Sequence, residues 1–371
     1  MQRAIKLSTA GDRIYLRQGR HARFRLSEYH KNPSGVATAS AKWLVISSAP
    51  GEHATVDAAI PPTYDVGALA GAHPIRISGA SYVIIENLEV TDSAVNRTHT
   101  CDPVTDTACP CDLNVESCQN RANNTGTGKG IQLDGPSIAG EKANAKSPNH
   151  HLIIRNCEIH GHGGTAIVGA NASYNIEILN NEIHHNGVMG LSEGYATYLE
   201  GRNHVIRGNY AHHNSGNGFR LGNTNNQGHY HLVDSVVENN FAYANGSRFW
   251  HSGRIVNDGA GIVLWGGHGN TIRNNIVAGS KGAGFWICGQ PNWNTSTNTW
   301  VDEPTKNPSP TIRATAMARK GCIFMALSLP GAKCRETPQS TTSSLTTLWW
   351  LLPRKNSIWV RELKLTTIFS A

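Results

Sequence analysis

The sequence predicts an all-β chain whose strands wind into a parallel β-solenoid, and three observations support this. An Asn-centred turn recurs, with aligned positions at 157, 181, 209, 240 and 275, which are 24, 28, 31 and 35 residues apart. A short β-branched run precedes each turn, and a Gly-led strand such as 261–265 follows several of them. No long run in this region has a helical period, which argues against βαβ units.

The repeat length decides between two repetitive β architectures. A propeller blade needs about 40–45 residues in four antiparallel strands, which is longer than these intervals. Short strands separated by Gly and Asn fit a solenoid instead, in which each coil stacks on the last at about 4.8 Å. The aligned segments are residues 86–91, 155–160, 179–184, 207–212, 238–243 and 273–278.

The asparagines at the aligned position predict a structural stack. Asn tolerates the left-handed backbone angles of a tight turn, and its amide can hydrogen-bond to the equivalent amide one coil away. We therefore expect a structural rather than a catalytic role for Asn181, Asn209, Asn240 and Asn275.

The net charge of +7 is unevenly distributed and marks a boundary in the chain. Residues 306–371 hold ten Lys and Arg against two Glu, a local net charge of +8, which leaves residues 1–305 at −1. We expect 1–305 to be the β-solenoid, with a Cys-rich insertion at about 95–128, and 306–371 to lie outside it. A shifted reading frame or a fused unrelated end explains such a tail, and a genuine basic tail is the alternative. The solenoid itself shows no excess of positive charge, so we expect no nucleic-acid partner.

The start of the chain shows no secretory signal. Residues 1–10 lack an apolar core and a cleavage-site pattern, so we expect the sequence to be truncated at its front. No stretch reaches the roughly 18–20 apolar residues that span a bilayer, and we expect no membrane partner.

The repeats resemble the right-handed parallel β-helix proteins of the pectate-lyase-like superfamily, over about residues 4–300. Residues 10–19, 50–52 and 75–88 are similar in order to the start of chondroitinase-B-like and alginate-lyase-like β-helices. The resemblance implies a single-stranded right-handed parallel β-helix of the pectin-lyase-like class. It also implies an N-terminal helix that caps the open core, for which only a stub precedes Gly11.

In that superfamily the Gly-led strands belong to the first sheet, where the cleft usually lies. Alternation along a strand then assigns two outward columns. The expected inward residues are Ile131, Leu133, Thr197, Leu199, Phe219, Leu221, Ile262, Leu264, Phe285 and Ile287. One outward column is Gln132, Val168, Tyr198, Arg220, Val263 and Trp286, and the other is Asp134, Ala170, Glu200, Gly222, Trp265 and Cys288.

The outward columns contain the candidate site. Tyr198 and Arg220 fall on adjacent coils about 4.8 Å apart, and Glu200 is diagonal to Arg220. We expect these three residues to be catalytic, and the alternative is surface packing with an ordinary ion pair. Aromatic faces stack on sugar rings and polar groups bind hydroxyls, so the expected substrate-binding residues are Gln132, Asp134, Trp265 and Trp286.

The resemblance implies a polysaccharide lyase, which removes a proton alpha to a uronate carboxylate and expels the glycosidic oxygen. Arg220 would be the base or the carboxylate clamp, and Tyr198 the acid. Ca²⁺ enters by resemblance only: Asp258, in residues 257–262, is weakly similar to a calcium-site segment of some pectate lyases. The lysine that this family carries at the end of the next strand is absent.

Histidines share one repeat position in three coils. His160, His184 and His212 are expected to stack, with His185 and His213 beside the latter two. Stacked imidazoles could bind a transition metal, but no neighbouring carboxylate or Cys is evident to complete a ligand set. We therefore expect a structural stack and no metal site.

Four of the eight cysteines lie close together in the insertion. Their spacing lacks the Cys-x2-Cys pattern of zinc ribbons, so we expect two disulfides, in one of three connectivities, and an oxidising compartment. These residues are Cys101, Cys109, Cys111 and Cys118. Cys157 replaces an asparagine of the stack and is expected to be buried and inert.

Together these features predict a secreted or cell-surface, monomeric, carbohydrate-directed protein. A lyase of uronic-acid polymers is the favoured activity. The alternatives are a non-catalytic glycan-binding or surface β-helix, and a degenerate inactive fragment.

Overall fold

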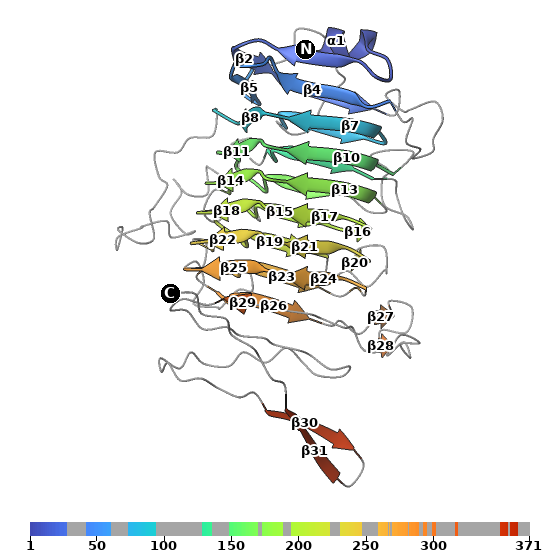
Figure 1. The fold of residues 1–371 in the computed structure, drawn as a ribbon, viewed down its shortest axis with the longest axis vertical. Helices are drawn as coiled ribbons and strands as arrows, with labels where there is room; N and C mark the ends of the chain where they lie inside the picture. The colour runs from blue at the N-terminus through green and yellow to red at the C-terminus, as the bar shows by residue number, and fades with distance from the viewer. Residues whose placement is uncertain are drawn as a thin grey trace.

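The computed structural model is a stack of β-coils whose long axis runs from α1 (Gln2–Leu7) toward the later strands (Figure 1). The model describes residues 1–27, 42–60, 73–93, 128–135, 148–169, 173–187, 194–222, 231–246, 259–265, 267, 269–280, 282–288, 292–294, 299–301, 316–317, 349–354 and 357–362.

Three sheets form the wall of the stack, and all pairings between coils within them are parallel. Sheet A contains β1 (Arg13–Leu16), β4 (Leu44–Ser48), β7 (Ser81–Glu86), β10 (His150–Arg155), β13 (Tyr174–Leu179), β17 (Val205–Arg207), β21 (Val236–Glu238) and β24 (Thr271–Arg273), with β16 (Gly201–Arg202) and β20 (Leu232–Val233) beside them.

Sheet B contains β2 (Gly19–Ala22), β5 (Ala54–Asp57), β8 (Leu88–Thr91), β11 (Glu158–His160), β14 (Glu182–His184), β18 (Tyr210–His212), β22 (Phe241–Tyr243), β25 (Asn275–Ala278) and β29 (Ala316–Met317). Sheet C contains β3 (Phe24–Ser27), β6 (Ile75–Ser78), β9 (Ile131–Asp134), β12 (Ile167–Gly169), β15 (Thr197–Leu199), β19 (Phe219–Leu221), β23 (Ile262–Trp265) and β26 (Phe285–Cys288). The predicted all-β parallel solenoid is confirmed.

The core is one continuous apolar column inside the three sheets. The register expected for the Gly-led strands is confirmed, because their inward residues are at most 5% exposed from Ile131 to Leu264. Phe285 is partly buried and packs against the same column. Parallel strands one coil apart therefore place equivalent apolar residues on top of one another, as the repeat requires.

The asparagines at the aligned position form a hydrogen-bonded row between sheets A and B. The side-chain oxygen of Asn209 accepts the backbone N–H of Asn181 at 3.0 Å, and that of Asn240 accepts the backbone N–H of Asn209 at 3.0 Å. Each amide also donates to a backbone carbonyl of a neighbouring coil, as Asn240 Nδ2 does to Ile206 at 2.9 Å. The row Asn181, Asn209, Asn240 and Asn275 is called the amide stack below.

A second row of asparagines lies five residues further along each coil. Asn214 accepts the backbone N–H of Asn186 at 3.2 Å, and Asn245 accepts that of Asn214 at 3.1 Å. These residues follow the strands of sheet B at the same 28- and 31-residue spacing as the first row, so the sequence carries a second asparagine repeat.

The stub before Gly11 forms α1, which covers the first coil at one end of the stack (Figure 1). Ile5 is fully buried in the core. The amide of Gln2 makes two hydrogen bonds to the backbone of Arg25 in β3, at 2.9 and 2.8 Å. A short helix thus covers the apolar column and pairs with an edge strand. No helix in the described part of the chain is long and apolar enough to cross a membrane.

Beyond residue 305 the structure describes three strands. β29 pairs in parallel with β25, and β30 (Trp349–Arg354) pairs antiparallel with β31 (Ser357–Glu362). Just before the boundary, β27 (Asn292–Asn294) pairs antiparallel with β28 (Thr299–Val301). The division at 305 stays a prediction.

The predicted disulfide cysteines, Cys101, Cys109, Cys111 and Cys118, lie outside the described residues. Cys157 is buried with a free thiol, and burial raises its pKa to about 12. That environment disfavours the reactive thiolate, as expected for an inert core cysteine.

Candidate functional site

The outer face of sheet C carries the first of the two predicted outward columns, which runs from Gln132 to Trp286. Gln132 pairs with Val168, which pairs with Tyr198 on the next coil. Tyr198 pairs with Arg220, and the column continues through Val263 to Trp286. The alternation of each strand therefore brings Tyr198 and Arg220 side by side on one face.

Arg220 lies between two tyrosines. The guanidinium carbon is 4.6 Å from the ring centroid of Tyr198 and 5.1 Å from that of Tyr195. Its Nη1 donates a hydrogen bond to the hydroxyl of Tyr195 at 2.5 Å. A cation against an aromatic face is stabilised by the ring quadrupole, so these contacts hold the guanidinium in one orientation. The arginine is 8% exposed, whereas Tyr198 is half-buried.

Tyr195 was missed by sequence reasoning. It is fully buried, and it precedes β15, so strand alternation does not assign it to a column. Its ring meets that of Tyr198 edge-on, with centroids 5.9 Å apart. The available signal was its place three residues before Tyr198, at the start of the Gly-led segment.

Glu200 directly follows β15 and is 5% exposed. Its backbone carbonyl accepts a hydrogen bond from His204 Nε2 at 2.8 Å, which ties the end of β15 to the entry of sheet A. Glu200 thus lies two residues from Tyr198 and within the same short segment of the wall.

Asp134 lies at the end of β9 and is 2% exposed. Its Oδ2 accepts hydrogen bonds from Arg76 Nε and from the hydroxyl of Ser78 at 2.6 Å. Its backbone carbonyl accepts another from Asn149 Nδ2 at 2.6 Å. This carboxylate is therefore engaged by two side chains of the neighbouring coil, and its contact with substrate stays a prediction.

The two tryptophans lie further along the same face. Their ring centroids are 5.4 Å apart at an angle of 40°. Trp265 is only 7% exposed and packs with Ala260 and Val263, while Trp286 is partly buried at the edge of that cluster. Gln132 is half-buried five coils from Trp286. Trp286 is consequently better placed than Trp265 to offer a ring to a ligand.

The residues of this face do not make a calcium site within the described part of the chain. Ca²⁺ takes six to eight oxygen ligands, and the acidic groups here are Glu200 and the already engaged Asp134. Asp258 lies outside the described residues.

One group of three metal-ligating side chains occurs on a different face, the outer side of sheet B. It consists of Glu182, His184 and His212. The expectation that no carboxylate lies near these histidines was wrong, because Glu182 is two residues before His184 on the same strand and points to the same side.

Comparison with known proteins agrees with the topology. Residues 145–301 match a family model described as a right-handed β-helix region. The chain folds as a right-handed parallel β-helix. Among curated proteins, no sequence matches this β-helix.

Solved structures similar to this β-helix include a pectate lyase, Pel9A, at 14% identity, covering 85% of this chain and 72% of that one with a TM-score of 0.46. An alginate lyase from Paenibacillus sp. str. FPU-7 is 17% identical, covering 78% and 90% of the two chains with a TM-score of 0.38. A GH136 lacto-N-biosidase from Eubacterium ramulus is 12% identical, covering 76% and 50% with a TM-score of 0.32. These likenesses concern the fold.

Proposed function

We propose that this β-helix is a secreted or cell-surface protein that cleaves uronic-acid-containing polysaccharides by β-elimination at the outer face of sheet C. The observation that carries the proposal is the Arg220 guanidinium held against Tyr198 and Tyr195. A fixed cation beside a hydroxyl-bearing side chain is what elimination next to a carboxylate needs. The lyase names among the similar structures are consistent with it at the level of the fold.

Three residues have separate roles in this elimination. Arg220 binds the uronate carboxylate and stabilises the negative charge that develops on it, since a guanidinium remains protonated at neutral pH. Glu200 accepts the proton alpha to the carboxylate. The electrons of that C–H bond form the new C=C bond, and the C–O bond to the glycosidic oxygen breaks. Tyr198 donates a proton to the departing oxygen, so charge and atoms balance.

The experiment measures the ultraviolet absorbance of the unsaturated uronate product on pectate, alginate and chondroitin, with and without Ca²⁺. Arg220→Lys and Tyr198→Phe should each lower kcat/KM by about a hundredfold or more. Arg202→Lys is the matched control, because Arg202 also lies over a tyrosine, Tyr174, at 5.2 Å but on sheet A. It should leave the rate unchanged.

Two outcomes would count against the lyase. No absorbance change on any of the three polymers, together with retained polymer binding, would exclude it. Equal loss in Arg220→Lys and Arg202→Lys would show that the effect is general to arginine–tyrosine contacts and not to this face.

A non-catalytic glycan-binding β-helix is the second candidate, favoured by exposed aromatic rings on sheet B. Phe241 is 36% exposed and Tyr243 is 39% exposed, and Phe241 stacks on Tyr210 with centroids 5.1 Å apart. Such rings can stack on sugars without any chemistry. Polymer binding without product, weakened by Phe241→Ala, would support this candidate.

A degenerate inactive fragment is the third candidate, and loss of both binding and cleavage would support it. Inspection of the encoding DNA tests it independently, because β-helix repeats restored in another frame after about residue 305 would mark a truncated solenoid.

A further inference from the structure

We propose that β14 and β18 carry a binding site for a divalent transition metal, formed by His184, His212 and Glu182. The site lies on the outer face of sheet B and is separate from the residues proposed to act on polysaccharide.

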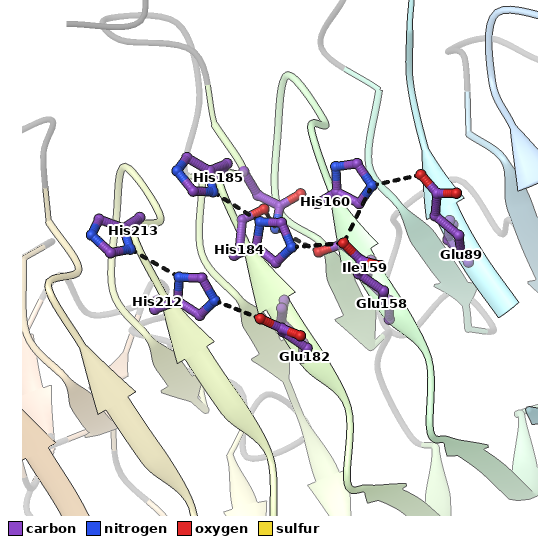
Figure 2. A network of polar contacts seen from close by, with 12 residues as sticks. Glu89, Glu158, Ile159, His160, Glu182, His184, His185, His212 and His213 are labelled. Carbon is purple, nitrogen blue, oxygen red and sulfur yellow. Dashed lines mark hydrogen bonds and ion pairs between the residues drawn. The ribbon is translucent and has the colours of Figure 1, made fainter. Parts of the chain in front are cut away.

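Two columns of side chains run along this face (Figure 2). Glu158 pairs with Glu182 in register, and His160 pairs with His184, which pairs with His212. Within a strand the carboxylate and the imidazole are two residues apart, so both point outward. The repeated Glu-Ile-His of residues 158–160 and 182–184 encodes this arrangement.

The three ligand atoms of the proposed site already lie close together. The nitrogen or oxygen atoms offered by Glu182, His184 and His212 are all within 4.8 Å of one another. Glu182 Oε1 is 3.1 Å from His212 Nε2, and the two imidazoles stack with centroids 4.8 Å apart. Metal bonds of about 2.0–2.2 Å require ligand atoms roughly 3–3.5 Å apart, so small side-chain rotations would complete the site. Glu182, whose side chain is 51% exposed, is free enough to make them.

A second pair of histidines orients the ligands. Nδ1 of His184 is 2.8 Å from Nδ1 of His185, and Nδ1 of His212 is 2.9 Å from Nδ1 of His213. These bonds occupy Nδ1. They leave Nε2 of His184 facing Glu158 and Nε2 of His212 facing Glu182 (Figure 2). Metal-bound histidines characteristically have the other ring nitrogen hydrogen-bonded, which sets the tautomer and the ring orientation.

The backbone shows that these supporting histidines are specific to two coils. His185 and His213 both have a φ of 52°, in the left-handed region that disfavours most side chains. Equivalent positions in neighbouring coils are Gly161, Ala244 and Gly279. Only the coils of β14 and β18, among those described, combine a ligand histidine with a histidine at this corner.

The donor set selects the class of ion. Two imidazole nitrogens and one carboxylate oxygen suit Zn²⁺ or Co²⁺, whereas Ca²⁺ and Mg²⁺ prefer oxygen ligands throughout. Three protein ligands leave a further position to water. In the absence of metal, a proton on Nε2 of each histidine makes the hydrogen bond to the neighbouring carboxylate, as Nε2 of His160 does to Glu89 at 2.9 Å. The metal would replace those protons.

The test is calorimetric titration of the tag-free, metal-stripped full chain with Zn²⁺ at about pH 7, where unperturbed imidazoles are mainly neutral. Co²⁺ absorption in the visible region reports the coordination geometry. We expect one Zn²⁺ per chain with micromolar or tighter affinity. His212→Ala and Glu182→Gln should weaken it at least about tenfold, and so should His213→Ala through ligand orientation.

His160→Ala is the matched control, because it removes an imidazole of the same stack one coil away and should change the affinity less than about twofold. Absence of Zn²⁺ binding, or equal affinity in the wild type and Glu182→Gln, would overturn the proposal. Glu182→Gln alters a half-exposed surface group, so it keeps the test valid if His212→Ala does not fold. Neither result depends on whether the protein cleaves polysaccharide.

Discussion

Two stacks of like residues run along this β-helix at repeat positions three residues apart, and they differ in what their side chains bind. The amide stack is at most 2% exposed, and its oxygens accept backbone N–H groups from the adjacent coil. The imidazoles of His160, His184 and His212 lie on the outer face and bond to other side chains. The same repeat therefore produces one row that completes the backbone hydrogen bonding and another that leaves ligand atoms at the surface.

The difference shows that stacking alone does not indicate a role. A buried polar group without a partner destabilises the fold by about 1–3 kcal/mol. Replacing a residue that hydrogen-bonds to a buried backbone group therefore lowers the stability of the protein. A partly exposed imidazole–carboxylate contact contributes far less. The two rows thus differ in whether their side chains hydrogen-bond to buried backbone groups.

The largest expected effect is on the amide stack. Asn240→Ala removes the acceptor for the backbone N–H of Asn209 and the donor to Ile206, both buried. We expect a loss of about 4 kcal/mol in the free energy of unfolding, measured by urea denaturation.

The adjacent residue is the control. Asn239 is exposed and has a φ of 55°, which glycine adopts easily, so Asn239→Gly should change stability by less than about 0.5 kcal/mol. Similar losses in both variants would remove the distinction between buried and exposed asparagines.

The imidazole of His204 is buried and, like the amide stack, accepts a backbone N–H of an adjacent coil. We therefore expect the stability of the protein to fall in acid. Nδ1 of His204 accepts the backbone N–H of Ile176 at 3.1 Å, and burial lowers its pKa to about 4. The unfolded chain binds this proton near pH 6.5 but the folded chain does not, so stability is full above about pH 6.5 and falls toward pH 4. The free energy of unfolding should fall by about 2 kcal/mol between about pH 7 and about pH 4.5.

The measurement compares unfolding free energies at about pH 7 and about pH 4.5 in the wild type and in His204→Asn, which copies the residue that Asn270 provides in the same row. His73, whose pKa burial and Lys129 also lower to about 4, leaves a residual slope in the variant. An unchanged slope in His204→Asn would contradict the assignment.

Cys157 interrupts the amide stack and offers a way to extend it. Its thiol, a weak hydrogen-bond donor, contacts the backbone carbonyls of Arg155 at 3.3 Å and Ile85 at 3.8 Å, where an asparagine amide would be a strong donor. Cys157→Asn should raise the unfolding free energy by about 1 kcal/mol. Thermal denaturation measures this change. Cys157→Ala should lower it, and a loss in both variants would show that the site has no room for the amide.

The smallest effect is expected on the outer stack. His212→Ala removes the contact to the half-exposed Glu182, the bond to His213 and the stack on His184, and should cost less than about 1 kcal/mol of stability. A loss as large as that of Asn240→Ala would mean that the imidazoles hold the coils together.

The parts of the fold that follow from local pattern were predictable from sequence. Alternation within the Gly-led strands assigned the inward and outward residues correctly, and the recurrent Asn marked the coil. Asp134 could not be understood this way, because its partner Arg76 is 58 residues away and meets it only through the register of two coils.

Glu182 was predictable from the sequence by the same rule, whereas Tyr195 was not. The alternation rule applied to sheet B would have placed Glu182 beside His184, since both lie on one strand two residues apart. Tyr195 could not be assigned by alternation, because it lies outside the strand that carries Tyr198. Site residues that precede or follow a strand depend on turns whose geometry the repeat pattern does not specify.

The separation of the two stacks is tested most directly by the rise in Tm that saturating Zn²⁺ causes in the wild type, Asn240→Ala and His212→Ala. Binding only to the folded state at about 100 times the Kd stabilises it by about 2.7 kcal/mol. We predict that Asn240→Ala has a much lower Tm but keeps the Zn²⁺-induced rise, while His212→Ala lowers the Tm only slightly and loses the rise. Loss of both properties together in either variant would contradict the account.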